Sequence, residues 1–112
     1  MDARRERLAK NEAIFREVNE RVGEIAESFD LRGDGAYLVD FVCECADAGC
    51  FDQIRLTLAE YRDVRSSPIR FALHNGHVDA EVDRVVAESD RFTLVEKKGE
   101  AADLAAELDP RT

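Results

Sequence analysis

The sequence lacks long apolar runs and an excess of basic residues. No segment approaches the roughly 18 apolar residues that a membrane-spanning helix needs. The first residues lead into a charged stretch instead of the apolar segment of a secretory signal. Sixteen Lys and Arg face 25 Asp and Glu, so the net charge is −9, which repels nucleic acid and anionic membranes at long range. We therefore expect a soluble, acidic, cytoplasmic protein with no membrane partner, and a nucleic-acid partner is disfavoured.

Motifs that carry catalysis are also missing. The chain has no Gly-rich phosphate loop, no nucleophile elbow and no H-E-x-x-H zinc-protease motif. Gly33-Asp34-Gly35 is expected to be a turn, and the many carboxylates are expected to be solvated surface groups. The sequence therefore predicts a protein that is not an enzyme, with no catalytic and no organic-cofactor site.

Residues 4–29 have the pattern of one amphipathic helix. Asn11 falls on the predicted apolar stripe, as polar residues that set the register of coiled coils do. Two interpretations are open: the stripe lies on a sheet of the same domain, or it pairs with the helix of a second copy. The apolar residues of the stripe recur at spacings of three and four, and they are Leu8, Phe15, Val18, Val22, Ile25 and Phe29.

The rest of the chain predicts an α+β domain with short helices and a mainly antiparallel four-stranded sheet. The expected strands are 36–43, 51–56, 69–73 and 91–96. The expected short helices are 58–65 with a capping box of Thr57 and Glu60, 80–87 with Asp79 as N-cap, and 101–108.

Three cysteines lie within eight residues: Cys43, Cys45 and Cys50. Cys43 and Cys45 are two apart at the end of a predicted strand, so their side chains share one face. The loop that follows can bring Cys50 back to the same point. Thiolates are preferred ligands of zinc in tetrahedral structural sites, and clustered cysteines in a cytosolic chain favour metal binding over a disulfide. The segment therefore predicts a zinc-knuckle-like hairpin, in which Glu44 either tunes the site or faces water.

A closed tetrahedral site needs a fourth ligand, and the chain has two histidines, His74 and His77. We predict His77, because the Asn-Gly pair before it can turn the chain so that the ring reaches back. His74 is expected to be a surface residue of that turn. Asp47, Asp52 or water are alternatives to histidine, and iron is an alternative to zinc. Without metal, the cysteines would be buried thiols or a redox switch.

Several of these segments resemble a group of small uncharacterised actinobacterial-type proteins. The similarity lies in the F-x-C-E-C motif at residues 41–45, the third cysteine at Cys50 and the L-T-L-A-E-Y segment at residues 56–61. The segment 11–21 and the Gly76-His77 pair are also similar. The resemblance covers roughly residues 5–97.

This resemblance implies the fold and supports His77 as a ligand, and it implies no activity. Members of the group carry a P-G-H turn, whereas this chain has Asn75 at the proline position. His74 has no counterpart in the group.

These observations predict one domain over residues 1–112, with the amphipathic helix at 4–29, a zinc-stabilised α+β core at 36–97 and a C-terminal helix at 99–109. The expected function is a small, non-catalytic binding, adaptor or regulatory protein. We expect a protein partner, and a homodimer through the N-terminal helix is one form of it. A thiol redox sensor and a nucleic-acid-associated regulator are the alternatives. The predicted ligands of one structural zinc ion are Cys43, Cys45, Cys50 and His77.

Overall fold

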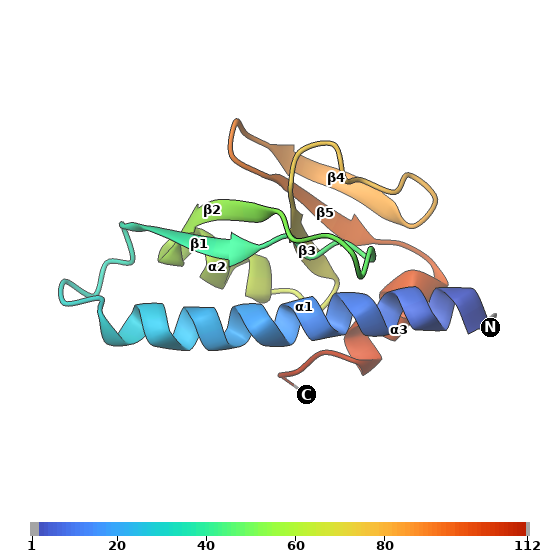
Figure 1. The fold of residues 1–112 in the computed structure, drawn as a ribbon, viewed down its shortest axis with the longest axis horizontal. Helices are drawn as coiled ribbons and strands as arrows, with labels where there is room; N and C mark the ends of the chain where they lie inside the picture. The colour runs from blue at the N-terminus through green and yellow to red at the C-terminus, as the bar shows by residue number, and fades with distance from the viewer. Residues whose placement is uncertain (1–2, 112) are drawn as a thin grey trace.

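The long helix α1 (Ala3–Ser28) forms one side of the molecule. The computed structural model describes residues 3–111. A helix of 26 residues is about 39 Å long, and the longest dimension of the molecule is 45 Å. The helix therefore runs along nearly the whole molecule (Figure 1), and each of its ends lies within one residue of the predicted 4–29. Among the helices of residues 3–111, none combines the length and the apolar character that crossing a membrane requires.

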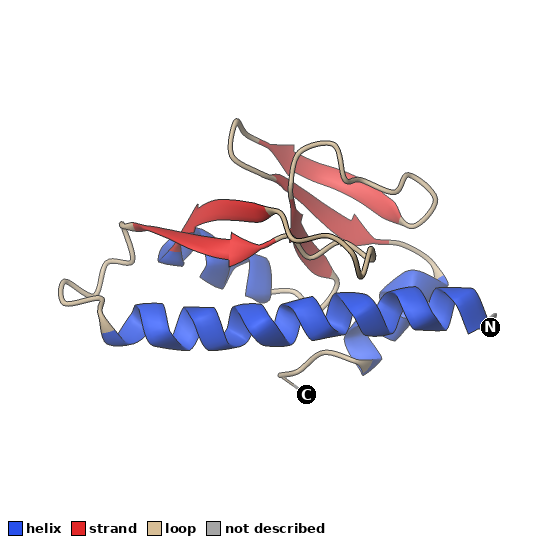
Figure 2. Ribbon diagram, in the orientation of Figure 1, coloured by secondary structure: helices blue, strands red, loops and turns tan. Residues whose placement is uncertain are grey.

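Two small antiparallel sheets lie on one side of α1 (Figure 2). In the first, β1 (Leu38–Val42) and β2 (Gln53–Thr57) form a hairpin. In the second, β5 (Thr93–Lys97) lies between β3 (Arg70–Leu73) and β4 (Asp83–Glu88). The predicted α+β class and antiparallel pairing are confirmed. The prediction of one four-stranded sheet is wrong, because the hairpin forms a sheet of its own and the described chain has five strands.

Two short helices lie behind α1 in Figure 1 and contact it. The first, α2 (Leu58–Arg65), begins with the predicted capping box: Glu60 N–H donates to Thr57 Oγ1 at 3.1 Å, and Thr57 N–H donates to the Glu60 carboxylate at 2.7 Å. The second, α3 (Glu100–Glu107), starts one residue before the predicted boundary. Capping chemistry was therefore sufficient to locate α2.

The helix predicted over residues 80–87 is wrong. Asp79 does form a first turn, because its carbonyl and carboxylate accept hydrogen bonds from three of the following N–H groups. The chain then extends into β4. A bulge between Val85 and Ala87 makes Val86 an extra residue opposite β5. The bulge interrupts the alternation typical of a strand, which is why the valine spacing imitated a helix.

The face of α1 that packs on the domain also differs from the predicted one. The predicted apolar residues flank the buried face, and Val18, Ile25 and Phe29 are 41%, 62% and 72% exposed. The prediction that the helix lies on a sheet of the domain is confirmed in part, because α1 contacts β1 and Val22 packs against the core, whereas the other end of the stripe faces solvent. The residues that are buried form what we call the inner stripe: Ala9, Glu12, Arg16, Asn19, Gly23 and Ala26.

Polar members of the inner stripe are buried because each finds a partner. The Arg16 guanidinium lies 3.8 Å from the ring centre of Phe71 and donates to the carbonyl of Arg70 at 2.9 Å. The Asn19 amide accepts a hydrogen bond from the backbone N–H of Val42 and donates to its carbonyl, both at 2.9 Å. The helix is thus fixed by directional contacts to strand backbones, which a search for apolar periodicity does not detect.

The hydrophobic core consists of two clusters. One lies between the β1–β2 hairpin, α2 and the second sheet, and Phe41 stacks on Tyr61 there with ring centres 4.4 Å apart. The other contains Cys43 and Cys45 together with residues of β3, β5 and α3. Two predicted metal ligands therefore belong to a packed core.

Candidate metal centre

The three cysteines lie where the β1–β2 hairpin turns back. Cys43 follows β1 directly, and Cys50 precedes β2. Within the loop, the Asp47 carboxylate accepts a hydrogen bond from Gly49 N–H at 2.9 Å, and the Asp47 carbonyl accepts one from Cys50 N–H at 2.9 Å. This turn returns Cys50 toward Cys43 and Cys45, as the sequence spacing predicted.

The predicted histidine ligand comes from a second turn, after β3. His77 N–H donates to the carbonyl of His74 at 3.1 Å, and Gly76 has a φ of +92°, in the region that glycine adopts most readily. The turn directs the His77 ring at the hairpin loop. Its Nδ1 lies 3.5 Å from Cys43 Sγ and 3.6 Å from Cys50 Sγ.

These distances fit a metal site. The ligand atoms of Cys43, Cys45, Cys50 and His77 all lie within 4.8 Å of one another. In a tetrahedral zinc site, with bonds of about 2.3 Å to sulfur and 2.0 Å to nitrogen, a sulfur and a nitrogen lie roughly 3.5 Å apart. The observed sulfur–nitrogen distances are 3.5 and 3.6 Å. The cluster is therefore consistent with one metal ion such as zinc.

Two further groups orient these ligands. His77 Nε2 lies 3.2 Å from the Asp52 carboxylate, so the ring can present Nδ1 to a metal while its other nitrogen donates to Asp52. The backbone N–H of His74 donates to Cys43 Sγ at 3.1 Å. Hydrogen bonds of this kind fix the ring of a ligating histidine and offset the charge of a ligating thiolate.

The thiols themselves are ill suited to ionise without a cation. Burial raises the pKa of the Cys43 thiol far above its ordinary value; the His74 N–H opposes this shift, and the charge of neighbouring Cys45 adds to it. Burial likewise raises the pKa of Cys45. A bound metal ion supplies the positive charge that converts such thiols to thiolates. These two thiols are thus suited to a metal more than to a free, reactive thiolate.

Glu44, between the first two cysteines, faces the protein interior and not water. Its carboxylate is fully buried, accepting hydrogen bonds from the Asn19 amide at 2.8 Å and from Ala72 N–H at 3.0 Å. Burial raises the pKa of Glu44 above its ordinary value, although Asn19, Ala72 and Arg16 oppose this shift. Glu44 connects the candidate metal loop to α1 and β3, a role that the sequence pattern did not reveal.

A small cavity lies behind the cluster, between the start of α1 and α3. Its volume is about 40 Å³, and Cys45, His77, Glu12 and Lys97 contribute to its lining. Lys97 is buried and pairs with both Glu12 and Asp83, at 2.5 Å from the latter. The cavity has room for water and not for an organic substrate.

The structure brings together all four predicted ligands. The alternative ligand Asp47 uses its carboxylate within the hairpin loop. Asp52 lies against His77, and with His74 and His77 it forms a second group whose ligand atoms are within 4.8 Å of one another. His74 itself lies beside His77, with ring centres 5.0 Å apart.

Comparisons with known proteins add no relative: no family model matches the chain, and neither a curated protein nor a solved structure matches it significantly. The resemblance described from the sequence therefore stays a prediction.

Proposed function

We propose that this chain is a small, zinc-stabilised binding or adaptor module without catalytic activity. In this proposal Cys43, Cys45, Cys50 and His77 hold one structural zinc ion. The observation that carries it is the pair of sulfur–nitrogen distances, 3.5 and 3.6 Å, which match the spacing of a tetrahedral zinc site.

A structural role for the metal follows from the number and the surroundings of the ligands. Three thiolates and one imidazole complete a tetrahedral shell, so no position is left for a substrate or a reactive water. The adjacent cavity of about 40 Å³ is too small for an organic substrate. The ligands come from two turns that are 27 residues apart at their nearest, Cys50 and His77, so the ion would tie the hairpin to the turn after β3.

The binding role is inferred from the surface. A net charge of −9 disfavours nucleic acid, whereas several large apolar side chains are exposed, among them Phe29 and Phe51. We infer that the partner is a protein and that the module acts in the cytoplasm as a regulator or adaptor.

Elemental analysis of purified, untagged protein tests the metal proposal. We expect about one zinc per chain, with loss of metal in Cys45→Ser and retention in His74→Ala, a control in the same turn as the predicted ligand His77. Metal content near zero in protein purified without chelator, with all three thiols reacting freely with a thiol reagent, would refute the proposal. Iron in place of zinc would keep the site and change the metal.

A further inference from the structure

Helix α1 carries a second, outward-facing stripe beside the inner stripe. Its members follow one another at spacings of three and four without a break, the pattern with which one helix of a coiled coil packs on another. The outer stripe consists of Leu8, Asn11, Phe15, Val18, Val22, Ile25 and Phe29.

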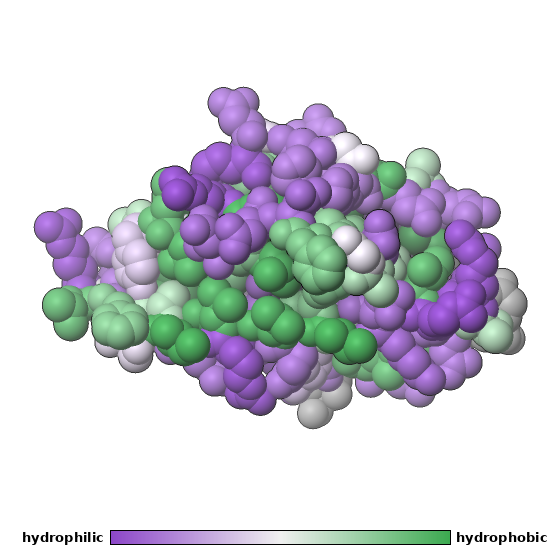
Figure 3. Space-filling view, in the orientation of Figure 1, coloured by the Kyte–Doolittle hydropathy of each residue, from purple (hydrophilic) through white to green (hydrophobic). Residues whose placement is uncertain are grey.

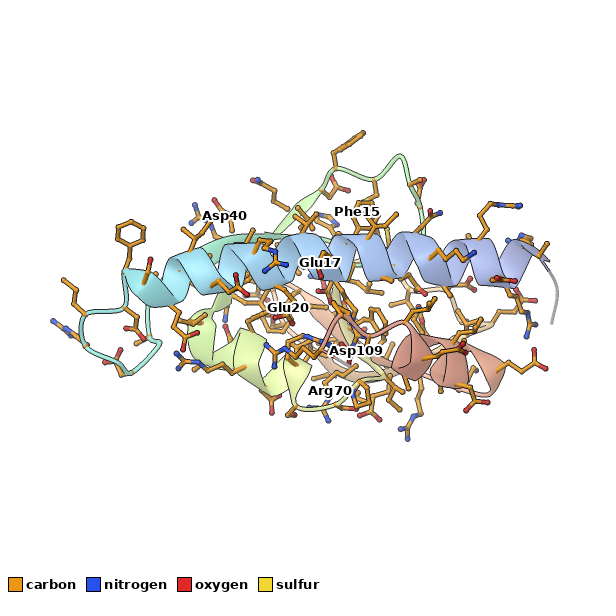
Figure 4. All side chains as sticks on the ribbon, turned by 90° about the horizontal axis from the view of Figure 1, so that it is seen from below. Phe15, Glu17, Glu20, Asp40, Arg70 and Asp109 are labelled. Atoms are coloured by element: carbon orange, nitrogen blue, oxygen red, sulfur yellow. The ribbon has the colours of Figure 1, made fainter. Side chains whose placement is uncertain are left out.

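The fold covers this stripe only in part: the Asn11 amide donates to the carbonyl of Ala46 at 3.1 Å and Val22 packs against the core, whereas the remainder lies at the surface. None of its residues is fully buried, and Val18, Ile25 and Phe29 are 41%, 62% and 72% exposed. Hydrophobic side chains gather along α1 on the face turned toward the viewer in Figure 3. Figure 4 shows Phe15 on the opposite side of α1 from Glu20 and Asp109, the side on which α2 and α3 lie. No helix of residues 3–111 therefore covers the outer stripe.

A partner helix is the occupant that fits this pattern. A sustained spacing of 3.5 residues suits packing against another helix, whereas a helix on a sheet needs only the 3.6-residue period of its own turns. The outer stripe borders a shallow apolar groove that includes Val22, Ile25, Tyr37 and Leu38. An added helix would rest on α1 and against the edge of β1.

The charges of α1 select a second copy in antiparallel orientation. Residues 3–10 contain four basic side chains and one acidic one, whereas residues 17–28 contain four acidic side chains and one basic one. An antiparallel pair places the basic start of each helix beside the acidic second half of the other, whereas a parallel pair places like charges together.

We propose that α1 pairs with α1 of a second copy through the outer stripe, antiparallel, with the two-fold axis between Phe15 and Val18. In this arrangement Leu8 lies near Ile25 of the partner subunit, and Asn11 lies near Val22 of the partner subunit. The metal centre contributes no ligand to this interface, so the dimer and the metal site can be tested separately.

The test is the mass of the protein in solution, by light scattering and sedimentation, from about 1 to 200 μM. The wild-type protein is expected to be a dimer at the upper concentrations. Val18→Glu combined with Ile25→Glu is expected to raise the dissociation constant at least about tenfold, because each copy would bury two uncompensated carboxylates. Val86→Glu is the matched control, since Val86 is 42% exposed, as Val18 is 41% exposed, but lies in β4 away from α1.

Folding and metal content are measured on the same samples. The double variant is expected to keep the circular dichroism spectrum and the metal content of the wild-type protein, because the exposed stripe residues do not reach the core. A variant that loses its fold is replaced by Ile25→Ser alone, for which the same direction of change is expected.

The orientation is tested by charge reversal. Lys10→Glu and Glu24→Lys are each expected to weaken the dimer severalfold at low salt, and the two together are expected to restore it, because an antiparallel pair brings position 10 of one chain near position 24 of the other. A monomer at all concentrations, or a dimer that the stripe variants leave unchanged, overturns the proposal. Failure of the double reversal to restore the dimer overturns the antiparallel arrangement.

Discussion

The metal centre and the inner stripe of α1 both join segments that are distant in the sequence, and they do so with polar atoms. The metal centre gathers four ligand atoms, of which Cys43 and His77 are 34 residues apart. The inner stripe binds through Arg16, Asn19 and Glu12 to strand backbones and to Lys97. In our proposal the first connection depends on an ion that can be removed, whereas the second is built into the chain and responds to mutation and pH.

Removal of the metal is expected to have the largest effect. Cys45→Ser, or treatment of the wild-type protein with a strong chelator, should lower the free energy of unfolding by about 3 kcal/mol or more, because the binding energy of a structural metal is folding energy. Thermal unfolding with and without chelator measures it, and His77→Ala should lie between Cys45→Ser and wild type. An unchanged melting temperature after chelation would contradict a structural metal.

Disruption of the buried charge cluster beneath α1 should cause the second-largest loss of stability. Lys97 is buried between Glu12 and Asp83, and the attraction of these carboxylates outweighs the effect of burial and raises its pKa. Lys97→Met leaves two buried carboxylates uncompensated and should cost about 3–5 kcal/mol while metal content stays the same. Lys98→Met, at an exposed neighbouring position, is the control. Urea unfolding measures the free energy of unfolding of both variants, and equal values for the two would contradict the prediction.

Acid should weaken the contact of α1 with α2 through Glu20, whose carboxylate accepts a hydrogen bond from Arg65 at 2.7 Å. Burial raises the pKa of Glu20, but hydrogen bonds and charges from Arg111 and Arg65 outweigh it and leave the pKa below its ordinary value. This group therefore stabilises the fold above about pH 4.5, and its contribution is lost as the pH falls through the lowered pKa.

The pH dependence can be isolated by comparing two variants. Glu20→Gln should cost about 1 kcal/mol at pH 7, a value that allows for solvent screening, and nearly nothing at the acid end of the transition. Exposed Glu88→Gln, in β4 and away from α1, measured at the same pH values, corrects for acid release of the metal. Parallel stability–pH curves for Glu20→Gln and wild type would refute this assignment.

The smallest effect is expected at His74. Its backbone N–H, and not its ring, contacts Cys43 Sγ, so His74→Ala keeps that hydrogen bond. The free energy of unfolding should change by no more than about 0.5 kcal/mol. A loss as large as that of His77→Ala would contradict the assignment of His77 as the single histidine ligand.

The sequence was most informative where chemistry is local. The spacing of Cys43, Cys45 and Cys50 placed them at a hairpin, and an Asn-Gly turn selected His77; the structure brings all four together. The capping box located α2 for the same reason, because its atoms belong to neighbouring residues.

Elements that depend on distant partners were harder to predict. The inner stripe of α1 contains Glu12 and Arg16, two charged residues that are buried because the folded chain supplies partners for them. Glu12 pairs with Lys97, and Arg16 contacts the ring of Phe71 and a carbonyl of β3. In β4, the bulge at Val86 arises from pairing with β5, and it shifts the valine spacing so that the local pattern resembles that of a helix. Glu44 likewise acquires its partners from α1 and β3.

During synthesis, β3 emerges before its sheet partner. β3 is an edge strand whose neighbour is β5, the last strand of the described chain, while all four candidate metal ligands precede residue 78. A nascent chain therefore holds the complete donor set at a stage when the edge of β3 that pairs with β5 is still free and open to association with other chains. Zinc supplied during translation should accordingly give more folded protein and fewer aggregates than the same amount of zinc added afterwards.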